Sequence, residues 1–224
     1  ENIKNNMDPI VNGEVDFMHP FLSFASEETL SSRLIEELGE KFSISASEIR
    51  DAVHKAWVEL EECRDDMRKK GEETVAFLDK TGNRGIVLAG RPYHIDPEVN
   101  HGIDTLITRA GAAVITEDSI SNRVEKFPTT VLNQWTYHAR LYAAARYCCT
   151  QRDMDLVQLV SFGCGVDAIT SDETREILQA GGKLYTQLKI DEITNLGAVR
   201  IRLRSLFAAL DEQDEARETA RKEA

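Results

Sequence analysis

The sequence predicts an α/β fold, with a flavodoxin-like parallel sheet of about four strands in the order 2-1-3-4, flanked by helices. Two observations predict it. After Gly82, short apolar runs alternate with segments of helical periodicity, the pattern of parallel strands joined by crossover helices. Before Gly82, one apolar stripe keeps helical spacing for many residues, which predicts a long helix in an N-terminal extension.

These patterns divide the chain of 224 residues into three parts. Residues 1–81 form an arm and the long helical extension, residues 82–210 the α/β domain, and residues 211–224 a charged tail. Residues 1–24 lack helical or strand periodicity but carry several Phe and Met side chains, so we expect an extended arm that packs on the body or on a neighbour. The tail has little apolar content and is expected to be solvated or frayed.

The long helix begins with a capping box formed by Ser45 and Glu48. Apolar residues at helical spacing then continue to about Lys80, which gives about 34 residues and a length of roughly 50 Å. Gly71 is the position at which this helix could break, because glycine weakens a helix interior.

The α/β domain contains four apolar runs that we read as strands, at residues 85–89, 112–116, 156–162 and 184–190. Asp96 is expected to cap the helix after the first strand, with Pro97 at its first position. A second helix is expected over residues 130–147. Thr170 and Glu173 resemble a capping box that opens the helix after the third strand. The predicted strand order places the first and third strands side by side, and their carboxyl ends define the expected site.

The first strand ends in the motif Gly90-Arg91-Pro92-Tyr93-His94. Gly90 and Tyr93 are candidates for cofactor binding, Arg91 could hold an anion or cofactor, and His94 could donate a hydrogen bond or a proton. The alternative is a rigid strand-to-helix turn in which Arg91 forms a salt bridge. The aromatic cluster of Trp135, Tyr137, His138 and Tyr142 is expected to belong mainly to the core and to an interface.

The third strand ends at Gly163-Cys164-Gly165, where the two glycines allow the backbone to turn sharply and approach a ligand. The thiolate of Cys164 is a soft metal ligand and a nucleophile, so Cys164 is the candidate metal ligand and its glycines are candidates for cofactor binding. The alternative is a small buried thiol. Cys148 and Cys149 are expected to be packing residues at a helix end.

The composition excludes several classes of function. The net charge of −12 argues against general binding to nucleic acids or anionic membranes, which need a positive surface. No apolar run approaches the length that spans a bilayer, and no signal peptide is evident. Few cysteines and no export signal favour the reducing cytoplasm.

Several long motifs together resemble a known family, over about Phe17 to Leu210. They are GIVLAGRPYHIDPEVNHGI, AAVITEDSIS, NQWTYHARLY, VQLVSFGCGVDAIT and LKIDEITNLGAVRIRLRSL. They resemble the CoA-substrate-specific activases, or acyl-CoA dehydratase activase-related proteins, in the part that is similar to the iron–sulfur subunits of 2-hydroxyacyl-CoA dehydratases.

The resemblance implies a role in ATP-driven electron transfer. In such proteins an activase domain delivers an electron to a [4Fe–4S] cluster, and the electron is used to make a radical on an acyl-CoA thioester. Cysteines from two α/β domains hold the cluster, and Cys164 matches the cysteine that follows a strand of the C-terminal domain. The implied partners are an N-terminal cluster domain and an ATP-dependent activase domain, in the same chain or a partner chain, with acyl-CoA as a further candidate ligand.

The sequence departs from this family pattern because neither the cluster domain nor the ATP-binding domain is present in it. One cysteine does not hold a [4Fe–4S] cluster, which usually has four cysteine ligands. We therefore expect this piece alone to be inactive and without its cluster, with ATP bound only on a separate activase domain. The alternative function is a non-catalytic binding or scaffold module with an anion-binding sheet end.

Overall fold

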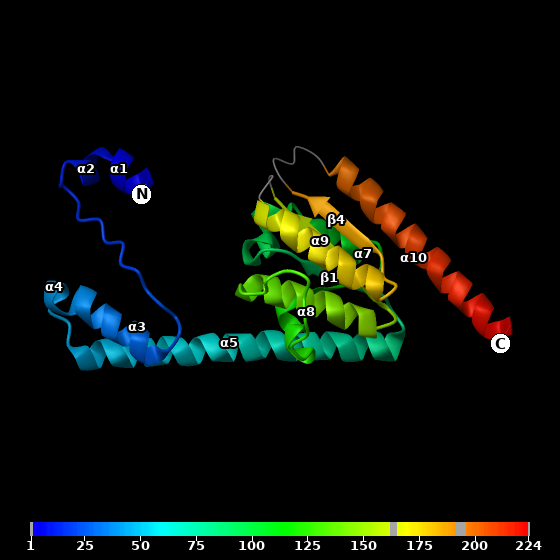
Figure 1. Cartoon of the computed structure of the whole chain (residues 1–224), viewed down its shortest axis with the longest axis horizontal. Helices are drawn as coiled ribbons and strands as arrows, with labels where there is room; N and C mark the ends of the chain where they lie inside the picture. The colour runs from blue at the N-terminus through cyan, green and yellow to red at the C-terminus, as the bar shows by residue number, and fades with distance from the viewer. Residues whose placement is uncertain (1, 162–164, 191–195, 224) are drawn as a thin grey trace. The chain divides into compact units, whose positions relative to one another are not determined.

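The computed structural model describes residues 2–161, 165–190 and 196–223 (Figure 1). Two compact units divide the chain, Glu1–Cys63 and Arg64–Ala224, and each is described by itself. The boundary falls within helix α5 (Ala46–Thr81), which is continuous over 36 residues. The predicted long helix is therefore confirmed, and it does not break at Gly71.

The first unit is helical and has a small core of its own. Its elements before α5 are α1 (Asn2–Asn6), α2 (Asp8–Val11), α3 (Glu27–Leu34), the π-helical turn η1 (Ile35–Gly39) and α4 (Glu40–Phe42). The prediction of an arm without helices was wrong at its start, although residues 16–24 do lack helix and strand. Leu30, Ile49 and Val53 form the core. Phe21 and Phe24 stay 84% and 69% exposed, so this part of the arm leaves apolar surface uncovered.

The second unit is built on a sheet of four parallel strands in the order β2-β1-β3-β4, which confirms the predicted order. The strands are β1 (Gly85–Ala89), β2 (Ala113–Thr116), β3 (Met154–Val160) and β4 (Tyr185–Lys189). Every residue of the two central strands, β1 and β3, is buried. This burial on both faces explains why the central strands are rich in apolar residues, although β3 also contains buried Asp155 and Gln158.

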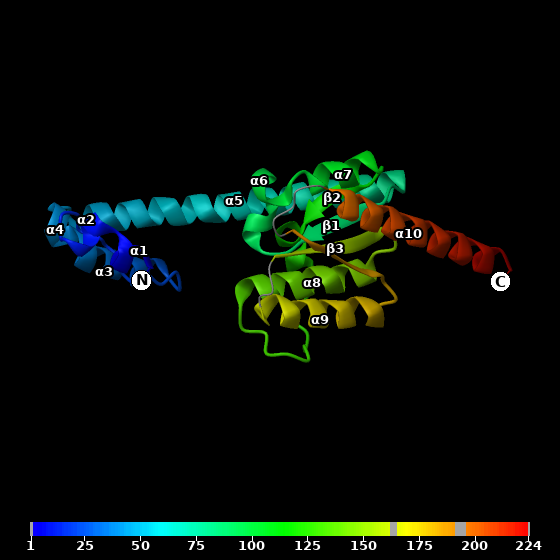
Figure 2. The ribbon, with the colours of Figure 1, turned by 90° about the horizontal axis from the view of Figure 1, so that it is seen from above.

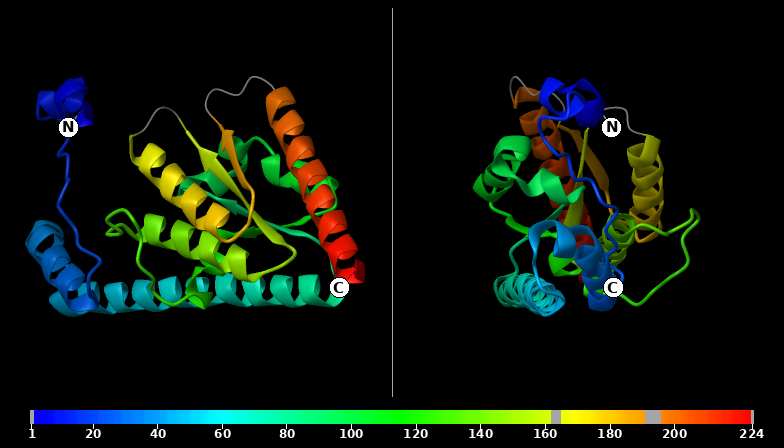
Figure 3. Two further views of the ribbon diagram at one scale, coloured as in Figure 1. Left: turned by 45° about the vertical axis from the view of Figure 1, so that its right-hand side comes forward. Right: turned by 90° about the vertical axis from the view of Figure 1, so that its left-hand side faces the viewer.

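Helices cover both faces of the sheet, with α8 (Thr136–Thr150) and α9 (Gly165–Ala180) on one face and α7 (Ile103–Arg109) and α10 (Gly197–Glu223) on the other (Figure 2). Val75 and Leu78 of α5 join the first of these two core layers. In the second layer, α10 lies beside β4 (Figure 3), and Arg202 donates a hydrogen bond to the carbonyl of Gln187 at 3.1 Å.

Several helix boundaries differ from the predictions. The helix expected after β1 is divided into η2 (Pro92–Ile95), α6 (Pro97–Asn100) and α7, because His101 and Gly102 take φ angles of 54° and 78° between the last two. Such left-handed residues interrupt the helical hydrogen bonds. The side chain of Asp96 does cap α6 as predicted, by accepting from the N–H of Glu98.

The segment after β2 contains two short 3-10 turns, η3 (Glu117–Ser119) and η4 (Ser121–Arg123). Helix α8 then begins at Thr136, six residues later than predicted. The capping box at Thr170 and Glu173 was also wrong, because both residues lie inside α9. Thr170 donates to the carbonyl of Val166 within the helix, and Glu173 accepts a hydrogen bond from Thr130.

The charged segment after Asp211 is helical, not frayed, since α10 continues to Glu223. Arg84, which directly precedes β1, donates to Asp211 at 2.9 Å and to Asp214 at 2.6 Å. These ion pairs tie α10 to the start of the sheet. Among the described residues, no helix combines the length and the apolar composition that crossing a bilayer requires.

Candidate functional site

The carboxyl ends of β1 and β3 leave the sheet side by side, as the strand order predicted. Ala89 lies opposite Gln158 in the parallel register, so Gly90 and Ser161 emerge at the same edge. Helix α9 resumes the described chain at Gly165. Gly163 and Cys164 lie outside the described residues, and their expected roles in cofactor and metal binding stay predictions.

Gly90 and His94 form a closely packed turn at the end of β1. A Cβ atom on Gly90 would lie 2.4 Å from Nδ1 of His94 and 2.9 Å from the carbonyl oxygen of Leu159, so only glycine fits there. Nδ1 of His94 accepts a hydrogen bond from the backbone N–H of Arg91 at 3.1 Å. The neutral ring therefore carries its proton on Nε2, which lies 3.4 Å from Oγ of Ser161.

The His94 ring is almost completely buried, with 1% of its surface exposed. Burial lowers its pKa; the charge of Arg91 also lowers it, while the charge of Asp167 opposes the shift. The neutral form of His94 is thus favoured at pH 7. Its Nε2–H can donate a hydrogen bond to the hydroxyl of Ser161, which lies at the carboxyl edge of the sheet.

Arg91 forms a salt bridge with Asp167, the alternative that the sequence left open. Its Nε and Nη2 donate to Oδ1 of Asp167 at 3.0 and 2.8 Å, and its Nη1 donates to the hydroxyl of Tyr93 at 3.3 Å. The other oxygen of Asp167 accepts from the N–H of Ser161 at 3.4 Å. The pair is mostly buried and links the β1 turn to the first turn of α9. A catalytic or binding role for Arg91 stays a prediction.

Tyr93 contacts this salt bridge through Arg91, and Gly165 begins the helix that carries Asp167. The Tyr93 ring is 45% exposed and contacts the His94 ring edge-on, with its hydroxyl 3.3 Å from Oγ of Ser161. A Cβ atom on Gly165 would meet no atom within 4 Å, so packing among the described residues does not require glycine there.

Helix α8 contributes two further buried polar side chains, His138 and Tyr142. His138 is 8% exposed and Tyr142 is 1% exposed, yet neither Nε2 of His138 nor the Tyr142 hydroxyl has a hydrogen-bond partner among the described residues. Burial lowers the pKa of His138; the charge of Asp167 opposes this and the charge of Arg91 adds to it, which places His138 near that pair. The predicted core location is confirmed for His138 and Tyr142 but not for Trp135, which is 47% exposed, and the unpartnered polar atoms were not anticipated.

The sequence reading also missed Asp167, the acid that orients Arg91. An acidic residue in the first turn after a glycine-rich strand end is a usable signal, because it can pair with a cation from the neighbouring strand end. That signal is weak alone, since acids are common in first helical turns.

A second acid–arginine pair lies at the end of β2, on the same edge of the sheet. Glu117 is 4% exposed, and its Oε1 is 3.9 Å from Nη2 of Arg140, beyond hydrogen-bond distance. Burial raises the pKa of Glu117 to about 7, with a contribution from Asp118. The site therefore contains one tightly paired carboxylate and one poorly paired one.

The comparison with protein families concerns the first half of the chain. Residues 1–120 match the family described as CoA enzyme activase uncharacterised domain (DUF2229). The chain belongs to this CoA enzyme activase-related family. The match includes the Gly90–His94 motif and Glu117, whereas His138, Cys164 and Asp167 lie beyond it. No curated protein matches the chain, and no solved structure does.

Two of the three described cysteines of this CoA enzyme activase-related chain, Cys148 and Cys149, are poorly placed to bind a metal. Cys63 is exposed on α5 in the first unit. Cys148 is fully buried, which raises the pKa of its thiol far above the ordinary value. Cys149 packs so closely that a Cβ atom on Gly181 would lie 2.3 Å from its sulfur. Among the described residues, no group of three or more His, Cys, Asp or Glu side chains could hold a metal ion.

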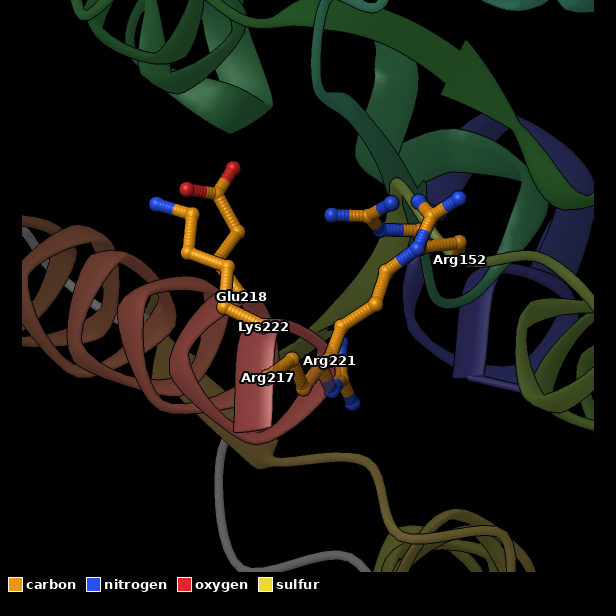
Figure 4. Close-up of a pocket in the computed structure, with 5 residues that line it drawn as sticks. All are labelled: Arg152, Arg217, Glu218, Arg221 and Lys222. Atoms are coloured by element: carbon orange, nitrogen blue, oxygen red, sulfur yellow. The ribbon is translucent and has the colours of Figure 1, made fainter. Parts of the chain in front are cut away.

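A separate basic cluster lies at the opposite, amino edge of the sheet. Arg152, just before β3, and Arg221, from α10, extend toward one another beside a cavity of about 580 Å³ (Figure 4). Arg217, Glu218 and Lys222 complete its lining, and all five residues are exposed. Long exposed side chains lose much conformational freedom on binding, so this cluster is a weaker candidate site than the carboxyl edge.

Proposed function

We propose that this CoA enzyme activase-related chain takes part in electron transfer to a CoA-thioester reaction and supplies one thiolate, from Cys164, to a [4Fe–4S] cluster. The observation that carries the proposal is the position of the residues around Cys164 in the chain. Ser161 and Gly165 flank the undescribed stretch, and both belong to the edge where Arg91, His94 and Asp167 meet. Sites of open parallel sheets lie at this carboxyl edge.

Elimination among the cysteines supports the choice of Cys164. A ligand thiol must be reachable and deprotonated. Cys148 is buried and holds its proton, and Cys149 is fixed by packing. Cys63 is reachable, but it lies within α5 and not after a strand, where the family resemblance places the ligand cysteine. Cys164 is the remaining cysteine of the sequence.

The other ligands must come from outside this sequence. A [4Fe–4S] cluster usually takes four thiolates, and it supplies one-electron transfer when bound. We therefore propose that an N-terminal cluster domain provides the remaining cysteines, that ATP binds on a separate activase domain, and that an acyl-CoA is the substrate. These domains would belong to the same chain or to a partner chain.

The residues of this chain would prepare the site electrostatically. Arg91 is held in place by Asp167, so its positive charge is fixed at the edge without a reorganisation cost. That charge would stabilise an anionic group of the substrate or balance the negative charge of cluster thiolates. His94 would keep its proton at Nε2 and donate it as a hydrogen bond through Ser161.

The test is anaerobic purification together with the cluster and activase domains, followed by iron and sulfide analysis. We expect Cys164→Ser to lower the iron content or shift the visible spectrum of the cluster. Cys148→Ser and Cys63→Ser are matched controls that should keep both unchanged. Full iron and an unchanged spectrum in Cys164→Ser would exclude the ligand assignment.

That negative outcome would favour the second candidate, a non-catalytic module that binds an anion at the sheet edge. The buried, unpartnered Nε2 of His138, whose pKa responds to the charges of Arg91 and Asp167, supports it. Phosphate titration followed by NMR of the His138 ring protons would then show a saturable shift that Arg91→Gln abolishes.

A further inference from the structure

The second unit has a groove of about 790 Å³ between α5 and the segment that leads into α8. Its volume lies within the range of small-molecule sites. Residues 64–68 of α5 form one side, and residues of the 121–127 segment and of 133–143 form the other. None of the residues singled out at the β1 end, from Gly90 to His94, lines it.

Specific contacts hold the walls of this groove in place. A Cβ atom on Gly71 would lie 2.4 Å from the carbonyl oxygen of Ser119, so α5 seats directly on η3. Buried Glu173 of α9 accepts hydrogen bonds from both the N–H and the hydroxyl of Thr130, which anchors the long loop before α8. The groove is therefore bounded by fixed backbone on both sides.

More cations than acids line the groove although the chain is strongly acidic. The four cations are Arg64, Arg68, Lys126 and Arg140, the two acids are Asp118 and Glu125, and Arg68 also pairs with Asp65 at 2.7 Å. The whole chain carries a net charge of −12. A local excess of cations in an acidic protein attracts small anions selectively to that surface.

Arg140 is placed to receive such an anion. Its Nη2 is 3.9 Å from Glu117, too far for a hydrogen bond, and its Nε is buried without a hydrogen-bond partner among the described residues. Although Nε is buried, 30% of the Arg140 side chain is exposed, so the accessible part of the guanidinium can donate to an anionic acceptor in the groove. A guanidinium binds carboxylate and phosphate oxygens particularly well.

The lining also contains apolar side chains, including Met67, Phe127 and Trp135. The Trp135 ring is 47% exposed and stacks on His138 with 5.0 Å between ring centroids. A purely inorganic anion would leave these surfaces in water. A ligand with an apolar body would cover them and gain about 25 cal/mol for each Å² buried.

We propose that this groove binds a small organic anion, with a carboxylate or phosphate group at Arg140 and an apolar body against Phe127 and Trp135. The site is independent of Cys164 and of any cluster, so its test does not depend on the proposed function.

The test uses Trp135 as the reporter, in a Trp57→Phe background that leaves it as the one tryptophan of the chain. Octanoate and octyl phosphate are titrated below their micelle concentrations, with octanol as the neutral probe. We expect a saturable change in Trp135 emission with both anions and not with octanol. A stronger response to one of the two anions identifies the preferred head group.

Arg140→Gln should weaken anion binding about tenfold or more, because it removes a charge-assisted hydrogen bond. Arg146→Gln is the matched control, an exposed arginine of the same helix that does not line the groove. If Arg140→Gln does not fold, Arg140→Lys keeps the charge without Nε and should bind with intermediate affinity. Equal binding of octanol, no saturation, or unchanged affinity in the Arg140 variant would overturn the proposal.

Discussion

The ends of β1 and β2 leave the same edge of one sheet, and each carries a largely buried acid–arginine pair. At the β1 end, Arg91 makes two hydrogen bonds of 2.8 and 3.0 Å to Asp167, whose other oxygen accepts from a backbone N–H. At the β2 end, Arg140 stays 3.9 Å from Glu117, and burial raises the pKa of Glu117 to about 7. The two pairs therefore differ in hydrogen bonding and not only in the distance between their charges. Hydrogen bonds hold Arg91 rigidly, whereas Arg140, without a hydrogen bond to Glu117, can respond to a ligand.

The largest effect should come from breaking the tight pair. Asp167→Ala leaves the Arg91 guanidinium, 19% exposed, without its main acceptor, and we expect a loss of about 3 kcal/mol in the free energy of unfolding. Urea denaturation measures it. Asp172→Ala, which removes an exposed ion pair with Arg175 on the same helix, should cost less than about 0.5 kcal/mol. Equal losses in the two variants would mean that burial does not distinguish these pairs.

Changing the acid of the poorly paired Glu117–Arg140 group should increase the free energy of unfolding instead of lowering it. Between pH 4.5 and about 7, folded Glu117 keeps a proton that the unfolded chain has lost, so its contribution to stability falls as the pH rises. Glu117→Gln removes this penalty. Relative to wild type, the variant should gain about 2–3 kcal/mol at pH 8 and almost nothing near pH 4. Paired denaturation curves at the two pH values test this, and a gain that does not change with pH would contradict it.

A smaller loss of stability should follow from a substitution that forces α5 away from the turn η3 at the end of β2. Gly71→Ala places a methyl group 2.4 Å from the Ser119 carbonyl, and the overpacking should exceed the helix-propensity gain by about 1 kcal/mol. Gly39→Ala, whose Cβ would make ordinary contacts of 3.6 Å or more, should not destabilise. Thermal unfolding of both variants gives the comparison. Stabilisation by Gly71→Ala would show that α5 does not need to approach η3 so closely.

The sheet was predictable because its strands are short apolar runs between helical patterns. The strand order was chosen as the flavodoxin-like arrangement, one of several orders that the rules for parallel sheets allow. The start of β3 was not predictable, since Met154 and Asp155 already pair with β1. An aspartate inside a buried strand breaks the apolar pattern. Here Lys183, 3.4 Å away, balances its charge, and a contact between residues so far apart in sequence leaves no local signal.

The site was predictable in part for the same reason. Arg91 and His94 directly follow a strand, so their place at the sheet edge comes from the topology alone. His138 and Asp167 lie on helices, and which helical side chains turn inward depends on tertiary packing. The spacing of Thr170 and Glu173 matches that of a capping box, but Glu173 accepts a hydrogen bond from Thr130, 43 positions earlier in the sequence. No local sequence pattern predicts such a contact.

The buried side chain of Lys183 protects the amino edge of the sheet from proteolysis. Its ammonium group donates to the carbonyls of Arg152 and Met154 at 2.9 and 2.8 Å, and the residue is 7% exposed. A lysine directly after two glycines would otherwise be an easy cleavage site for trypsin, which must draw the side chain into its own specificity pocket. Cleavage after Lys183 therefore requires the β3–β4 region to open, because the side chain is buried and its ammonium group is held by two carbonyl groups. The rate of cleavage at Lys183 in limited proteolysis thus reports how often this part of the sheet opens.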